Sequence, residues 1–196
     1  MTESTPGSDC VGLINFMTPS SSSSLFRNGK VKIDRDADGD TSQSQGVKVE
    51  TKSLTILDAR QITTNAPNCE TNGFELQNQP LANSELDFLD HESVVRSYYS
   101  ECERIVTTTT RARAFAFDHN VRSASGEKSQ RRISGGQHVQ GPAHMVHGDY
   151  TLKGAPERLW QLTEPPRGND TLKGFLPDGE ALIPQSLAQR AIDTGR

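Results

Sequence analysis

Residues 90–106 of the chain read DHESVVRSYYSECERIV, and this stretch carries the strongest periodicity in the sequence. Asp90 stands where the N-cap of a helix is expected. Four threonines follow at 107–110, and threonine is a poor residue for a helix interior. The sequence therefore predicts one clear helix over about 91–106, with one apolar face against a core. The apolar residues recur every three or four positions, as one helical face requires, and are Val94, Val95, Tyr98, Tyr99, Cys102, Ile105 and Val106.

Short segments in which polar and apolar residues alternate flank this helix on both sides. Residues 30–33, 47–51 and 54–57 precede it, and residues 113–117 follow it. Alternation with a period of two residues is typical of half-buried β-strands. A shorter helix is expected near the end of the chain, at 186–193. The pattern predicts a mainly β protein with some helix, of the α+β class.

The first 29 residues differ in composition from the rest of the chain. They are rich in serine and threonine, with five consecutive serines at 20–24. Such a polar segment buries too little apolar surface to offset the entropy that is lost on ordering. We therefore expect a flexible leader over 1–29 and a single domain over 30–196.

The overall composition narrows the classes of function. The chain has 196 residues, with 21 Lys and Arg against 25 Asp and Glu and a formal net charge of −4. This balance argues against a nucleic-acid or polybasic membrane surface, and no apolar run approaches the roughly 18 residues of a spanning helix. Cys10, Cys69 and Cys102 form neither a disulfide framework nor a zinc motif. We expect a cytoplasmic protein that binds neither nucleic acid nor membrane.

The sharpest candidate for chemistry is the pair His147 and Asp149. Residues two apart in a strand point to the same face, so this imidazole and carboxylate would converge on one metal ion. They would supply two of the three ligands in the 2-His-1-carboxylate arrangement of non-haem iron oxygenases. The same spacing also fits a loop histidine beside a turn aspartate, and the pattern alone favours that interpretation.

Other short patterns offer alternative interpretations. The aspartates of 34–40 copy the first half of a calcium loop, but the second half lacks its glutamate. His144 and His147 have a spacing that would pair them on a helix, which the neighbouring glycines and proline disfavour. Asp118 and His119 fit a structural cap at the end of a strand. None of these patterns displaces the pair at 147 and 149.

Several motif blocks occur together in one order along the chain. The most specific blocks are Phe-Asp-His-x-x-Arg at 117–122 and Val-His-Gly-Asp-Tyr-Thr at 146–151, and they are preceded by Tyr-Tyr-x-Glu at 98–101. In this combination the chain resembles the fungal hydroxylase/desaturase family, which includes the aspergillic-acid hydroxylase/desaturase and the gibberellin desaturase. The resemblance covers about residues 54–160.

This resemblance implies an oxidoreductase of fungal secondary-metabolite biosynthesis, similar to the non-haem Fe(II)/2-oxoglutarate-dependent oxygenases. The implied fold is a distorted, jelly-roll-like double-stranded β-helix. The implied cofactors are Fe(II) and 2-oxoglutarate, with His147 and Asp149 as the metal ligands. The implied substrate is a small natural-product intermediate, and both hydroxylation and desaturation fit the resemblance.

The family pattern continues beyond the position that matches Arg196, where it supplies a distal histidine and a basic residue. Here no histidine follows His147. We therefore expect a C-terminally truncated protein with a partial β-helix, whose open sheet edge would favour self-association. The alternative to an active enzyme is an inactive truncated family member that acts as a binding or interaction protein.

Overall fold

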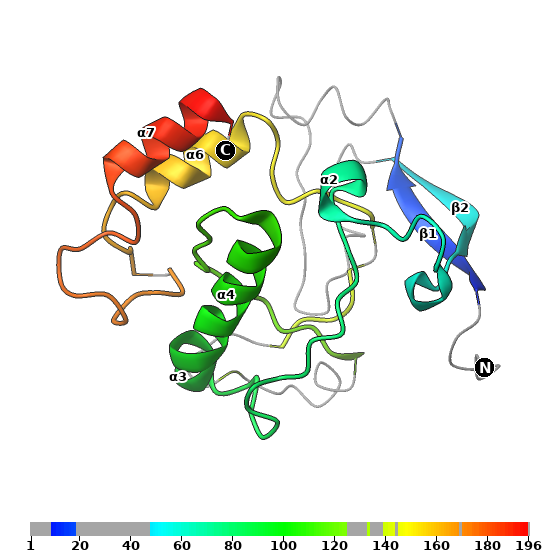
Figure 1. The fold of residues 1–196 in the computed structure, drawn as a ribbon, viewed down its shortest axis with the longest axis horizontal. Helices are drawn as coiled ribbons and strands as arrows, with labels where there is room; N and C mark the ends of the chain where they lie inside the picture. The colour runs from blue at the N-terminus through cyan, green and yellow to red at the C-terminus, as the bar shows by residue number, and fades with distance from the viewer. Residues whose placement is uncertain are drawn as a thin grey trace. The chain divides into compact units, whose positions relative to one another are not determined.

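The structure is a computed structural model that describes residues 9–18, 48–124, 133, 139–143, 145–168 and 170–195 (Figure 1). The chain divides into two compact units, and each is described by itself. The first unit comprises Met1–Leu81, Arg122–Gln130 and Gln140–His147. The second unit comprises Ala82–Val121, Arg131–Val139 and Gly148–Arg196.

The first unit contains a two-stranded antiparallel sheet, in which β1 (Cys10–Met17) lies beside β2 (Val49–Ile56), as Figure 1 shows. The strands predicted at 47–51 and 54–57 correspond to one continuous strand, β2, and residue 47 and the strand predicted at 30–33 lie outside the described residues. The register aligns the start of β1 with the end of β2, so that Cys10 lies opposite Ile56. Two short helical turns follow the sheet along the chain, η1 (Ala59–Gln61) and α2 (Cys69–Asn72).

β1 corrects the prediction of a flexible leader over residues 1–29. The residues CVGLINFM form a strand because their apolar and β-branched side chains suit a sheet surface and β2 supplies hydrogen-bonding partners. The serine-rich composition around them concealed this short segment. The prediction of a flexible leader was therefore wrong for Cys10–Met17, and the domain boundary at residue 30 stays a prediction.

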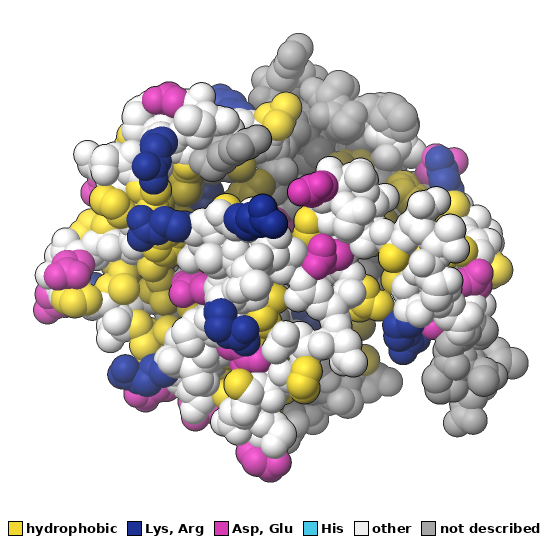
Figure 2. All heavy atoms as spheres, viewed as in Figure 1, with side chains coloured by type: hydrophobic (Ala, Val, Ile, Leu, Met, Phe, Trp, Pro, Cys, Tyr) yellow, Lys and Arg dark blue, Asp and Glu magenta, His cyan; other side chains and the backbone are white. Residues whose placement is uncertain are grey.

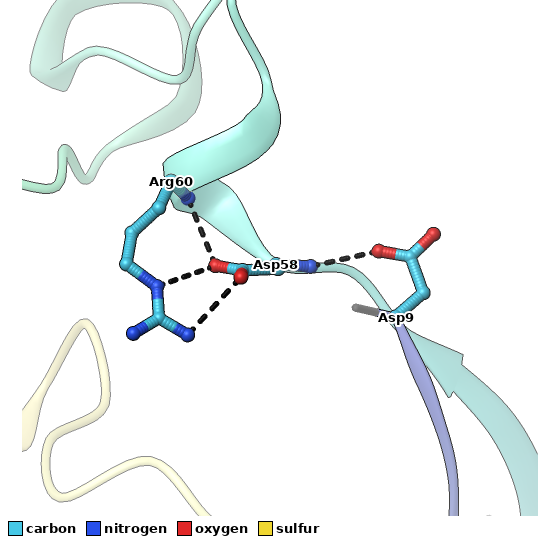
Figure 3. Close-up of polar contacts among 3 residues, drawn as sticks. All are labelled: Asp9, Asp58 and Arg60. Carbon is cyan, nitrogen blue, oxygen red and sulfur yellow. Dashed lines mark hydrogen bonds and ion pairs between the residues drawn. The ribbon is translucent and has the colours of Figure 1, made fainter. Parts of the chain in front are cut away.

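A polar network closes the sheet where β2 ends and β1 begins (Figure 3). The backbone N–H of Asp58 donates to Asp9 Oδ1 at 2.9 Å. The Arg60 guanidinium donates to both carboxylate oxygens of Asp58, at 2.8 and 3.0 Å. These hydrogen bonds from Arg60 lower the pKa of Asp58 below its ordinary value. The hydrogen bond from the Asp58 N–H to the Asp9 carboxylate joins the two strand ends, and the Arg60 guanidinium holds the Asp58 side chain in place.

The second unit contains the helix that the periodicity predicted. Asp90 is its N-cap, and the carboxylate accepts the N–H of Ser93. The helix extends about four residues beyond the predicted end, to Thr110, and the hydroxyls of Thr108 and Thr110 donate there to backbone carbonyls one turn earlier. Its three parts are α3 (His91–Ser93), a π-helical turn η2 (Val94–Tyr98) and α4 (Tyr99–Thr110).

Two further helices belong to the second unit. α7 (Gln185–Thr194) confirms the helix predicted at 186–193. α6 (Gly154–Gln161) was not predicted, because a glycine and a proline open it, although proline is tolerated in a first helical turn. The predicted strand at 113–117 is wrong. The Glu103 carboxylate, not a neighbouring strand, accepts the N–H of Ala116 in this segment, at 2.8 Å.

The described core of the second unit lies along the predicted apolar face of the helix. Val94 and Tyr99 are buried there together with Leu172, and Phe117 and Leu182 pack against them. The only sheet among the described residues is the β1–β2 pair, so the double-stranded β-helix stays a prediction. No helix in the described part of the chain is long and apolar enough to cross a membrane.

Candidate functional site

The segment that carries His147 runs beside β1 in the first unit. The backbone N–H of Val146 donates to the carbonyl oxygen of Asn15, at 2.9 Å. Asn15 belongs to β1 and lies opposite Thr51 of β2, whose hydroxyl donates to the Asn15 side-chain oxygen at 2.7 Å. The backbone immediately before His147 is therefore held at the outer edge of β1.

The imidazole of His147 is oriented by its own segment. Its Nδ1 lies 2.9 Å from the carbonyl oxygen of Met145. A carbonyl oxygen can only accept, so this contact requires the proton to be on Nδ1, and Nε2 then carries the lone pair. Histidines that bind metal ions commonly have this arrangement, because the hydrogen bond fixes both the tautomer and the ring orientation.

Asp149, the second predicted ligand, follows two residues later as an exposed residue of the second unit. His147 is exposed as well. Among the described residues, no group of three His, Cys, Asp or Glu side chains is arranged to hold a metal ion. The pair therefore stays a predicted set of two ligands, and the described residues do not assign a third.

Several residues that the sequence singled out lie outside the described part of the chain. They are the aspartates of the calcium-like stretch at 34–40 and two histidines, His138 and His144. The described residues therefore test neither the calcium interpretation nor the pairing of His144 with His147, both of which the sequence disfavours.

A second polar cluster lies in the second unit, built on the predicted helix. The hydroxyl of Tyr99, the first residue of α4, lies 2.8 Å from Nδ1 of His119. The His91 ring of α3 lies 5.3 Å from the His119 ring between centroids, and Phe175 packs edge-on against His91 at 5.3 Å. We call His91, Tyr99, Asp118, His119 and Thr171 the His119 cluster.

The remaining contacts of the His119 cluster join it to the segment between α6 and α7. Nε2 of His91 lies 3.1 Å from the carbonyl oxygen of Thr171. The hydroxyl of Thr171 donates to the Asp118 carboxylate. That carboxylate also accepts the backbone N–H of His119, at 2.9 Å. The cluster thus ties the helix to two segments that are distant in the sequence.

The surroundings of the His119 cluster keep its central pair uncharged. Burial lowers the pKa of His119 below its ordinary value of 6.5, and nearby His91 lowers it further, while Asp118 opposes them. Burial also raises the pKa of Tyr99 well above its ordinary value of 10. At neutral pH the central contact is therefore a hydrogen bond between a neutral phenol and a neutral imidazole.

In the sequence, Asp118 and His119 fit a structural cap, and their pattern indicates no connection with Tyr99. The signal was present, because Tyr99 and His119 belong to two motif blocks of the family resemblance, at 98–101 and 117–122. The structure shows that these two blocks meet through a side-chain hydrogen bond. Linear spacing could not reveal that contact.

Comparison with known proteins gives the class of the chain. Residues 14–175 match the family model described as an oxidoreductase/YMDC permease-like domain. Because this match spans most of the 196 residues, the chain belongs to that oxidoreductase-like family. No solved structure showed a significant match to the chain.

Two curated relatives accompany this assignment. One, from Methylophilus leisingeri, is named an uncharacterized protein in the dcmA 3′ region; it is 42% identical over 181 residues, which cover 92% of this chain and 82% of the relative. The other is named an oxidoreductase of Emericella nidulans; it is 32% identical over 123 residues, which cover 62% of this chain and 41% of the relative. The chain thus matches less than half of the fungal protein's length.

Proposed function

We propose that the protein is a hydroxylase/desaturase-type oxidoreductase that uses Fe(II) and 2-oxoglutarate and acts on a small natural-product intermediate. Membership of an oxidoreductase-like family supports the general class. The observation that carries the specific proposal is the contact between His147 Nδ1 and the Met145 carbonyl, because a hydrogen bond of this kind fixes the tautomer and orientation of metal-binding histidines.

The residues present suit iron in their chemistry. Imidazole nitrogen and carboxylate oxygen are the donors of the facial triad that binds non-haem Fe(II). His147 would supply Nε2 and Asp149 a carboxylate oxygen. The hydrogen bond from Val146 to Asn15 restrains the backbone before His147, so the ring has fewer conformations to lose when it binds the metal ion.

When bound, Fe(II) with 2-oxoglutarate and dioxygen would supply the oxidising power to remove hydrogen from an unactivated C–H bond. The protein's own contribution is to hold the two ligands and to position the substrate. The His119 cluster contributes by fixing the 117–122 block against the helix through the hydrogen bond between Tyr99 and His119.

The test is an anaerobic titration of the folded protein with Fe(II) in the presence of 2-oxoglutarate, following the visible charge-transfer band. We expect a saturable band that is lost in His147→Ala and in Asp149→Ala. Asp178→Ala is the matched control, because Asp178 is an exposed carboxylate of the second unit that the proposal does not use. This control should leave the band unchanged.

Two results would contradict the proposal. A band that survives both ligand substitutions would place the metal ion elsewhere. No band at all, in protein whose circular dichroism shows it to be folded, would favour the inactive binding protein. If the band forms, candidate substrates can be screened by mass spectrometry for the addition of one oxygen atom or the loss of two hydrogen atoms.

A further inference from the structure

The hydrogen-bonding directions of β2 follow from its register with β1. The N–H of Thr18 donates to the carbonyl of Lys48 at 2.9 Å, so the even-numbered residues of β2 direct their backbone groups toward β1. The odd-numbered residues direct theirs to the opposite side. No other strand of the described chain pairs with that side. The residues of this outer edge are Val49, Thr51, Ser53 and Thr55.

All eight residues of β2 are exposed. Val49, Leu54 and Ile56 are 49%, 39% and 45% exposed, and Figure 2 shows hydrophobic side chains at the surface on the right, where Figure 1 places the sheet. An exposed edge with apolar side chains is a template for pairing with another strand. A sheet of only two strands is also marginally stable by itself, so a further strand would stabilise it.

The charges of β2 select which strand can pair there. Glu50 and Lys52 stand on either side of Thr51 in the sequence, and their side chains share one face of the sheet. Lys52 Nζ lies 3.4 Å from Glu50 Oε2, and each side chain remains about half exposed. If a second β2 runs antiparallel with Thr51 opposite Thr51, each Glu50 lies opposite the Lys52 of the other copy. A shift to the next allowed register would oppose either the two lysines or the two glutamates, which is unfavourable.

We propose that β2 pairs edge to edge with β2 of a second copy of this chain, centred on Thr51, to form a symmetric dimer with a four-stranded sheet. The surface is self-complementary, because the same residues contribute from both copies; their charges attract when Thr51 lies opposite Thr51 and repel in the two neighbouring registers. Such a contact closes at two copies. The proposal does not depend on the function proposed above.

Sedimentation velocity on the full chain over a range of concentrations tests this dimer. We expect a species of twice the 21.5 kDa chain mass that dissociates on dilution. Glu50→Lys and Lys52→Glu should each raise the dissociation constant about tenfold or more, because each variant replaces two attractive pairs with two repulsive ones. An equimolar mixture of the two variants should form a heterodimer. The double variant, with both residues exchanged, should regain the homodimer.

Proline at Thr51 provides an independent test of the edge. The N–H of Thr51 points away from β1, so Thr51→Pro removes a donor of the outer edge and spares the β1–β2 hydrogen bonds. Thr51→Val is the matched control, because both variants lose the hydroxyl bond to Asn15 but only proline loses the N–H. We expect monomers for Thr51→Pro and dimers for Thr51→Val.

Several outcomes would overturn the proposal. They are a monomer at every concentration, an assembly larger than two copies, and a dimer that tolerates Thr51→Pro. A charge exchange that fails to restore association in protein with an unchanged circular dichroism spectrum would overturn the register.

Discussion

Removing the hydroxyl of Tyr99 tests whether the His119 cluster stabilises the second unit. Tyr99 is 7% exposed, and its hydroxyl lies 2.8 Å from His119 Nδ1. Tyr99→Phe keeps the ring, which packs edge-on against the His119 ring at 5.6 Å between centroids and contributes to the core with Val94 and Leu172. The substitution therefore removes one polar contact and leaves no large cavity.

The size of the effect follows from that contact. A net hydrogen bond contributes about 0.5–1.5 kcal/mol, and a partly buried imidazole nitrogen left without its partner adds to the loss. We expect Tyr99→Phe to lower the free energy of unfolding by about 1–2 kcal/mol. For a chain of this size that corresponds to a fall in Tm of about 2–8 °C.

The assay is urea unfolding at pH 8, where His119 is neutral. Tyr150→Phe is the matched control, since Tyr150 is 50% exposed and packs against Phe117 at 6.5 Å. In a His119→Ala background, Tyr99→Phe should cost much less, because its partner is already gone. A cost below about 0.5 kcal/mol in the wild-type background, equal to the control, would refute the reasoning.

Three further predictions concern the same unit. The folded state binds a proton on His119 less readily than the unfolded state does, because the pKa of His119 is lowered in the folded protein. The free energy of unfolding should therefore be full above pH 6.5, fall as the pH drops through that value, and level off below the folded pKa. His119→Gln should flatten this part of the profile, measured as urea midpoints against pH. Val94→Ala, at a residue that is 1% exposed, should cost about 2 kcal/mol in chemical unfolding, from two lost methyl groups and the cavity they leave. Asp90→Ala removes the N-cap acceptor for Ser93 and should cost about 1 kcal/mol, whereas Asp90→Asn should retain most of the stability.

The elements that could be predicted from the sequence are those that depend on interactions between residues close together in the chain. The helix from His91 was predictable, because an N-cap and a regular apolar face act within a few residues of each other. β1 was not, because a strand is defined by its partner, and β2 lies far along the chain. The strand expected at 113–117 was wrong for the same reason. Alternating polar and apolar residues suit the surface of a sheet, but a strand also needs a neighbouring strand to pair with.

Some features of the candidate site could likewise be predicted from the sequence, and others could not. The pair at His147 and Asp149 was found by spacing along one segment, which a single sequence displays. The contact between Tyr99 and His119 forms because the chain turns back toward α4 after that helix ends. The spacing of residues in the sequence does not reveal such a turn. The orientation of His147 depends on the backbone carbonyl of Met145, two residues earlier. The sequence could not predict this contact, because the residue types alone do not determine the local backbone conformation.

The hydrogen bond between Val146 and Asn15 has a consequence for how the protein is made. β1 leaves the ribosome before the segment that precedes His147, because Asn15 and Val146 lie far apart in the sequence. Contacts between such distant residues form slowly, because a long loop must close first. The surroundings of His147 are therefore completed late, after the helix over 91–110 has had time to form.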